Sequence, residues 1–177
     1  MKTKLNQSKL KLAIVSAMLL GTAGITAPAY ALDASLSVTA NIGMACSITT
    51  TPLDFGTYNA GGTHASANLE GTGGVSSPCT SGSSGVIKMG QGINFAADSN
   101  DASPLRRMVA TGDATSFLNY SVFSDTSRAL PWENSTGVAY EGTGLAQALV
   151  VYGSVEGGQT SAVVGSYTDT LVVAINY

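Results

Sequence analysis

Apolar and polar residues alternate one by one along several short stretches of this chain, and no other feature limits its possible folds as strongly. Residues 34–42 alternate without a break, and residues 118–123 alternate in the same way. Successive side chains of a β-strand point to opposite faces of a sheet, so this period of two indicates strands. After residue 31, no stretch shows a sustained helical period with capping residues. The sequence therefore predicts an all-β fold, a sandwich or a barrel.

The other expected strands are short and are separated by residues that favour turns. They lie at residues 45–50, 53–56, 86–89, 93–95, 107–110, 146–155 and 167–177, and the first of them stops before Pro52. Range 146–155 is almost continuously apolar, which predicts a central strand buried on both faces. Between Asn59 and Gly85, 18 of 27 residues are Gly, Ser, Thr or Asn, so we expect a long surface loop with room for one irregular strand.

The first 31 residues have a composition of their own. Four lysines and no acidic residue lie in positions 1–11, an apolar run continues to Ile25, and Ala29-Tyr30-Ala31 ends the segment. This order is typical of a secretory signal peptide, here cleaved after Ala31. A membrane anchor would need about 20 mostly apolar residues, and serine and glycine interrupt this run. We therefore expect one exported domain, residues 32–177, without direct membrane insertion.

The exported part is acidic. Residues 32–177 contain four basic and eleven acidic residues, which gives a net charge of −7. Recognition of nucleic acids needs a basic surface, and so does attraction to anionic lipids. The charge therefore argues against both classes of partner and mainly favours solubility.

Two cysteines, Cys46 and Cys79, are present, and both lie in the exported part. An oxidising compartment favours a disulfide between them, although two free buried thiols are the alternative. The bridge would close a loop of 33 residues. On the chain-entropy model such a loop stabilises the fold by about 3–4 kcal/mol.

No cluster of residues in the sequence indicates catalysis or metal binding. His64 is the only histidine, and no nucleophile motif lies near it. The oxygen-rich stretch 98–101 lacks the glycine and the distal glutamate of a calcium-binding loop. The glycine-rich stretch 71–74 has no lysine and no helical pattern after it, unlike a phosphate-binding loop. We expect a protein that is not an enzyme, with no catalytic residue, no metal site and no cofactor.

The two most regular strand patterns lie at the two ends of the exported chain, where termini are often frayed. The main apolar residues on one face of the N-terminal pattern are Leu36, Val38, Ala40 and Ile42. One face of the C-terminal pattern consists of Leu171, Val173, Ile175 and Tyr177. Periodicity alone favours ordinary strands that are buried in the chain's own sandwich.

Five stretches carry a more specific pattern, and they span the exported chain. They are residues 42–46, 106–108, 118–125, 128–132 and 167–177. The most specific feature is Tyr120-x-Val122-Phe123-x-Asp125, followed by an arginine and a Pro-Trp pair. Together the stretches resemble the spore coat protein U domain family, whose members include subunits of archaic chaperone–usher pili.

The resemblance implies an incomplete immunoglobulin-like β-sandwich of the pilin type, which is completed by a donor strand. Residues 32–42 would be the donor strand, with Leu36, Val38, Ala40 and Ile42 inserted into the groove of a neighbouring subunit. The four C-terminal residues Leu171, Val173, Ile175 and Tyr177 would form the groove edge and contact the chaperone. The implied partners are a periplasmic chaperone, an outer-membrane usher and identical or homologous pilus subunits, on a route through the periplasm to the cell surface.

Three functions therefore remain open. The resemblance favours a structural subunit of a surface fibre that serves adhesion and biofilm formation. The alternatives are a secreted spore-coat or matrix protein and a soluble carbohydrate-binding adhesin with the same fold. The end of the donor segment also remains open, because only three residues separate Ile42 from Cys46.

Overall fold

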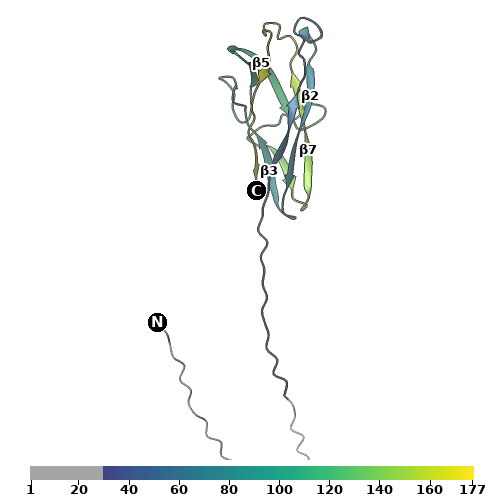
Figure 1. Cartoon of the computed structure of the whole chain (residues 1–177), viewed down its shortest axis with the longest axis vertical. Coiled ribbons are helices and arrows are strands. Elements are labelled where there is room, and N and C mark those ends of the chain that lie inside the picture. The colour runs from purple at the N-terminus through teal and green to yellow at the C-terminus, as the bar shows by residue number, and fades with distance from the viewer. Residues whose placement is uncertain (1–29) are drawn as a thin grey trace, which may run out of the picture. The chain divides into compact units, whose positions relative to one another are not determined.

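A computed structural model of the chain describes residues 30–177 (Figure 1). The expected signal peptide, 1–31, lies outside the described residues except for its last two positions. The chain divides into two units, one that ends at Ala40 and one that comprises Asn41–Tyr177. In the part of the chain that the structure describes, no helix is long and apolar enough to cross a membrane.

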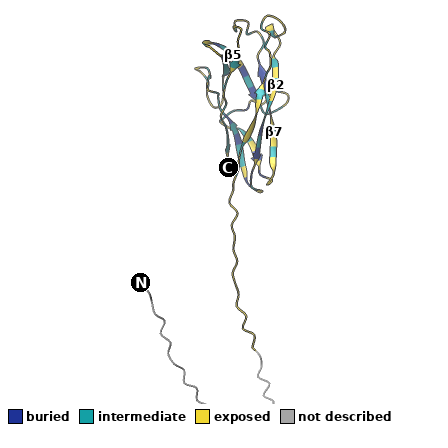
Figure 2. Ribbon diagram, in the orientation of Figure 1, coloured by how far each residue is buried: buried dark blue, intermediate teal, exposed yellow. Residues whose placement is uncertain are grey.

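Residues 30–44 form no strand or helix, and every one of them is exposed (Figure 2). The exposed fractions of Leu36, Val38 and Ile42 are 87%, 84% and 84%. The alternating segment 34–42 is therefore not a strand of the chain's own sandwich, which was the interpretation that periodicity alone favoured.

The folded unit consists of two antiparallel sheets, so the expected all-β fold is present. The larger sheet has six strands, in the order β1 (Thr49–Asp54), β2 (Leu69–Pro78), β7 (Ala146–Val155), β5 (Asp113–Phe123), β4 (Arg106–Ala110) and β8 (Tyr167–Thr168). The smaller sheet has the order β6 (Val138–Glu141), β3 (Ser84–Met89) and β9 (Val173–Asn176). The helical structure among residues 30–177 is limited to one 3-10 turn, Thr63–Ala65.

Side chains from both sheets form a single hydrophobic core, as two packed layers require. Its fully buried members include Trp132, Ile87 and Met89. The Trp132 indole Nε1 donates to the carbonyl oxygen of Ile87 at 2.9 Å, so the buried ring keeps a hydrogen-bond partner. Strand β7 is central, as expected, but only its second half is buried, and its first half exposes alternate residues.

Strand β2 corrects the expectation of a surface loop at 59–85. It pairs with β7 from Leu69 through Pro78, and its residues Val75 and Ser77 are 2% and 0% exposed. Its glycines allow close packing, because a Cβ at Gly73 would lie 3.0 Å from the carbonyl oxygen of Thr51. A stretch with the composition of a flexible loop thus forms a strand, and its glycines allow strand β1 to approach closely.

The C-terminal stretch is not one strand. Strand β8 pairs with β4 in the larger sheet, and after a crossover β9 pairs with β3 in the smaller sheet. Residues 93–95, expected as a strand, form no ladder, whereas β6 was not expected at all. Strand β1 runs through Pro52 with a register shift between Thr51 and Asp54, which an edge strand tolerates.

Candidate functional site

Strand β9 presents an unpaired edge. It pairs with β3, and its other side has no partner strand among residues 30–177. The Gly90 N–H donates to the carbonyl oxygen of Val172 at 2.8 Å, and hydrogen-bonded pairs alternate along an antiparallel ladder. The backbone groups of Val173 and Ile175 therefore point away from β3. Such an edge is a template for another strand.

The face that the sequence assigned to this edge is mostly turned to the protein interior. Leu171, Val173 and Ile175 are half-buried and pack against the core. Tyr177 is 55% exposed, and Val172 on the opposite face is exposed as well. The edge thus combines free backbone groups with side chains that continue the hydrophobic core.

A groove of about 760 Å³ opens onto the same core. Its rims are the backbone segments 54–60 and 162–166. Its apolar wall consists of Leu53, Phe55, Leu69, Met108, Leu118, Val155, Ala162 and Tyr167. No local sequence pattern predicts this groove, because its wall comes from strands that are far apart in the chain; the Leu53-x-Phe55 alternation is the one signal of it.

A partly buried polar network fixes the crossover that leads to β9. The Asp169 carboxylate accepts hydrogen bonds from the Tyr120 hydroxyl at 2.7 Å and from the backbone N–H of Ile93 at 3.0 Å. It also accepts from the Asn94 N–H at 3.2 Å, so one side chain ties residues 93–94 and β5 to the crossover. Burial and the hydrogen bond to Asp169 raise the pKa of the Tyr120 hydroxyl.

Arg106 belongs to the same region and is 2% exposed. Its guanidinium donates to the carbonyl oxygens of Gly90 at 2.9 Å, Met89 at 3.1 Å and Trp132 at 2.7 Å. Burial lowers the pKa of Arg106, and the nearby Tyr120 and Asp169 oppose this change. The arginine thus satisfies carbonyl groups at the end of β3, the strand that carries β9.

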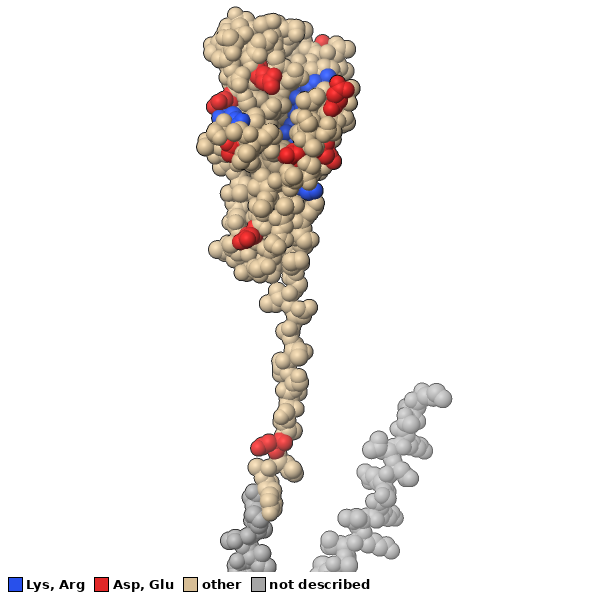
Figure 3. Space-filling view, turned by 180° about the vertical axis from the view of Figure 1, so that it is seen from behind, with Lys and Arg blue, Asp and Glu red and all other residues tan. Residues whose placement is uncertain are grey.

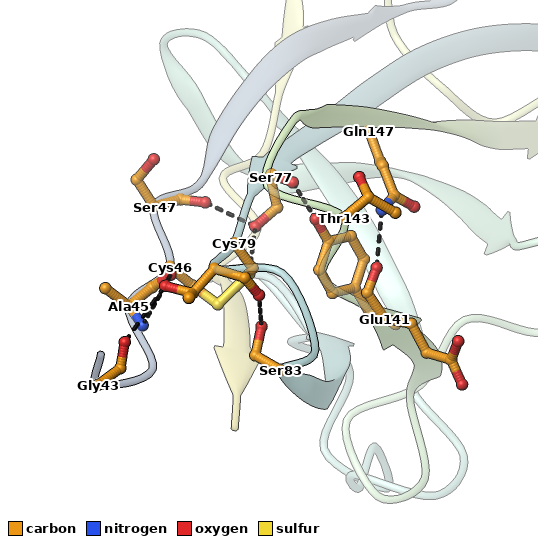
Figure 4. Close-up of a disulfide and its surroundings, with 12 residues drawn as sticks. Gly43, Ala45, Cys46, Ser47, Ser77, Cys79, Ser83, Glu141, Thr143 and Gln147 are labelled. Carbon is orange, nitrogen blue, oxygen red and sulfur yellow. Dashed lines mark hydrogen bonds between the residues drawn. A yellow bond between two sulfur atoms is a disulfide. The ribbon is translucent and has the colours of Figure 1, made fainter. Parts of the chain in front are cut away.

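The exposed N-terminal segment joins the folded unit beside the disulfide (Figure 4). The sulfur atoms of Cys46 and Cys79 are 2.02 Å apart, so the predicted bridge is present. The Thr80 N–H donates to the carbonyl oxygen of Ala45 at 2.9 Å, and the Ser47 N–H donates to that of Pro78 at 3.1 Å. Backbone-to-backbone attachment therefore begins at Ala45, and the Gly43 carbonyl oxygen accepts a longer hydrogen bond from the Thr80 hydroxyl at 3.4 Å.

His64 and the oxygen-rich stretch 98–101, in which the sequence showed no chemical site, make hydrogen bonds within the fold. The His64 Nδ1 accepts a hydrogen bond from the Asn59 N–H at 2.8 Å, and its ring stacks on Tyr58 at 5.0 Å. Asp101 accepts a hydrogen bond from Gln91 at 3.0 Å. Among residues 30–177 no three acidic, histidine or cysteine side chains gather as a metal site.

Residues 32–174 match the Spore Coat Protein U domain. The chain belongs to this family. This family member is 38% identical over 181 residues to Protein U of Myxococcus xanthus, with 98% of this chain and 100% of that protein covered. Its disulfide is typical of proteins exported to an oxidising compartment.

Among solved structures, the family member is similar to a chain in the CsuC–CsuE chaperone–tip adhesion subunit pre-assembly complex from archaic chaperone–usher Csu pili of Acinetobacter baumannii. The TM-score is 0.51 at 18% identity, and 77% of this chain is covered. The chain spans 40% of the length of the chain it matches there. The likeness confirms the expected pilin-like fold.

Proposed function

We propose that this protein is a structural subunit of a secreted surface fibre that assembles by donor-strand exchange. The observation that carries the proposal is the pairing of two unsatisfied parts in one chain. One part is the unpaired edge of β9 with a groove open to the same core. The other is the segment 30–44, which is exposed throughout and carries an apolar face.

Each part supplies what the other lacks. A strand added to the β9 edge satisfies the outward backbone groups of Val173 and Ile175, which is β-augmentation. Burial of Leu36, Val38 and Ile42, now exposed, contributes about 1.5–3 kcal/mol for each side chain. Because the donor and the acceptor are different parts of the chain, the contact is head-to-tail and generates a filament when it does not close.

The open edge also supports the proposed partners. A subunit whose edge and groove are empty exposes apolar surface and unpaired backbone groups, which favours aggregation. We propose that a periplasmic chaperone contacts Leu171, Val173, Ile175 and Tyr177 until an outer-membrane usher exchanges it for the next subunit. The similar solved structure is itself a complex of a chaperone with a tip adhesion subunit. A role of the fibre in adhesion and biofilm formation belongs to the same proposal.

Two variants that each lack one part test the proposal. Deletion of residues 32–42 leaves a subunit that only accepts a strand. Val173→Pro removes an outward N–H of the edge strand, a position where proline is tolerated, and leaves a subunit that only donates. Neither variant alone should polymerise, and a mixture should yield 1:1 dimers by light scattering. Polymers of the deletion variant would contradict the proposal.

The donor face has a matched control. Leu36→Asp with Val38→Asp places charges on the apolar face, whereas Ser37→Asp with Thr39→Asp places the same charges on the opposite face. The first pair should abolish dimer formation with the acceptor variant, and the second pair should weaken it much less. Equal effects of the two pairs would show that the apolar face does not enter a groove.

A coat or matrix protein is the second candidate function. The observation in its favour is the identity of 38% to Protein U along the whole of that protein. Immunogold labelling of intact cells separates the two functions. Thin surface fibres support the fibre subunit, whereas a continuous layer supports the coat.

A further inference from the structure

The disulfide lies where the exposed segment enters the folded unit. Residues 30–45 are all exposed, and Cys46 is the first half-buried residue of the chain after them. Its partner Cys79 directly follows β2, which pairs with the central strand β7 along its whole length. A covalent path therefore runs from the base of the segment into β2, an inner strand of the larger sheet.

The other attachments at this base are weaker. The Ala45–Thr80 and Ser47–Pro78 hydrogen bonds precede β1, an edge strand whose register with β2 shifts before Asp54. Tension on the segment would load the bond from the Thr80 hydroxyl to the Gly43 carbonyl oxygen first, then the Ala45–Thr80 bond, and then each following bond in turn. Bonds that are loaded one at a time give way more easily than bonds that share a load.

Strand β1 also belongs to the groove. Leu53 and Phe55 are part of the groove wall, and residues 54–60 form one of its rims. If β1 separated from β2, the wall would move with it. In a fibre, a pull on the donor segment of one subunit would then open the groove in which the same subunit holds its neighbour.

We propose that the Cys46–Cys79 disulfide passes tension from the segment 30–44 directly into β2, so that β1 and the groove keep their shape under load. This proposal rests on the proposed function, because only assembly into a fibre would place the segment under tension. With the disulfide in place, a pull on the donor segment of a subunit does not disturb the groove by which the same subunit accepts its neighbour.

An optical-trap measurement on residues 32–177 tests this mechanism. One handle is attached to the N-terminus at Leu32, and the other to the exposed Thr126 after β5. A fluorescent peptide of residues 32–44 occupies the groove. The disulfide-bonded protein is compared with the Cys46→Ser/Cys79→Ser variant, and with the parent protein after a phosphine reductant is added to the folded molecule.

Without the disulfide, we expect an early low-force step. It frees about eight residues at roughly 3.3–3.6 Å each, an extension on the order of 30 Å. The fluorescent peptide should leave the groove in the same step. With the disulfide intact, the step should be absent and the peptide should stay until the whole domain unfolds.

Val122→Ala is the matched control, because it creates a cavity in β5, a strand that contains neither cysteine and does not pair with β1. It should lower the force of global unfolding without adding the early step. The proposal is overturned if the bonded protein shows the early step, if the reduced protein lacks it, or if the peptide remains bound through it. If the peptide binds to no form of the protein, the proposed function is contradicted. The presence or absence of the early low-force step still shows whether the disulfide protects β1 from tension.

Discussion

Arg106 is the only charged side chain that is buried among residues 30–177, and it lies in a network that holds the crossover to β9. Its three acceptors are backbone carbonyl groups, so its removal would leave several buried polar groups without a partner. Tyr120 and Asp169 complete the network from β5 and from the crossover. The sequence singled out all three residues as parts of a family pattern, but their role as a buried support is visible only in the fold.

Tyr120→Phe should destabilise the fold by about 1–2 kcal/mol, because Asp169 loses a buried donor. The raised pKa adds a pH dependence. Tyrosine ionises near pH 10 in the unfolded chain and only at higher pH in the folded protein, so stability is lost as pH rises above about 10, at roughly 1.4 kcal/mol per pH unit. Urea unfolding at pH 8 and pH 11 should show a smaller alkaline loss for Tyr120→Phe than for the parent.

Tyr152→Phe is the control for this prediction. Its hydroxyl makes no hydrogen bond within the described residues, and its ring lies near Arg128. This variant should follow the parent at both pH values. An alkaline loss in Tyr120→Phe as large as in the parent would contradict the assigned cause.

At the scale of elements, strand β4 and the second half of β5 were predicted from sequence, and so was the central position of β7. Strand β2 was not, because the information that makes it a strand lies in its neighbours. Gly71 and Gly73 read as flexible in isolation, yet a Cβ at Gly71 would lie 2.9 Å from both the Asp54 carbonyl oxygen and the Phe55 ring. Long-range packing of this kind leaves no local periodicity to detect.

The candidate site, like strand β2, could be predicted only in part from local sequence patterns. Alternation identified the apolar face of each end, but for residues 34–42 it favoured a strand of the chain's own sandwich; the family resemblance implied a free segment. Alternation could not find the groove, whose wall combines Phe55, Met108, Leu118 and Tyr167 from distant positions. It also could not find the break between β8 and β9, because residues on both sides of the crossover continue the pattern.

Gly73→Ala and Gly74→Ala form a matched pair for the closeness of β1 and β2. A Cβ at Gly73 would meet the Thr51 carbonyl oxygen at 3.0 Å and the Leu53 Cα at 3.1 Å, whereas the nearest atom to one at Gly74 lies at 3.5 Å. Gly73→Ala should cost about 1–3 kcal/mol of stability and weaken binding of the 32–44 peptide, because Leu53 belongs to the groove wall. Thermal unfolding and fluorescence anisotropy measure the two effects, and equal behaviour of the variants would contradict them.

At the scale of the whole molecule, charge is sparse. Charged side chains leave wide uncharged areas on the face shown in Figure 3. Residues 32–177 nevertheless carry a net charge of −7, and Asp33 is the one charged residue of the proposed donor strand 32–42. If subunits assemble as proposed, long-range repulsion opposes their approach, while the contact between them is largely apolar.

Association of the acceptor-only and donor-only variants should therefore be faster at 150 mM salt than at 10 mM. The Debye length falls from about 30 Å to about 8 Å over this range, which screens the repulsion between subunits. Stopped-flow light scattering should show a several-fold higher association rate and a nearly unchanged dissociation rate. A slower association at 150 mM would indicate attraction between charged patches instead.

The presence of a free segment and an unpaired β9 edge in one chain has a consequence for the length of the proposed fibre. Such a polymer would have an empty groove at one terminus and an unused segment at the other, so it would be directional and would grow without a built-in stop. A copy that lacks residues 32–42 can occupy the last segment but offers none of its own. A small dose of that copy would act as a chain terminator, and the mean length of the polymer would report the ratio of the two copies.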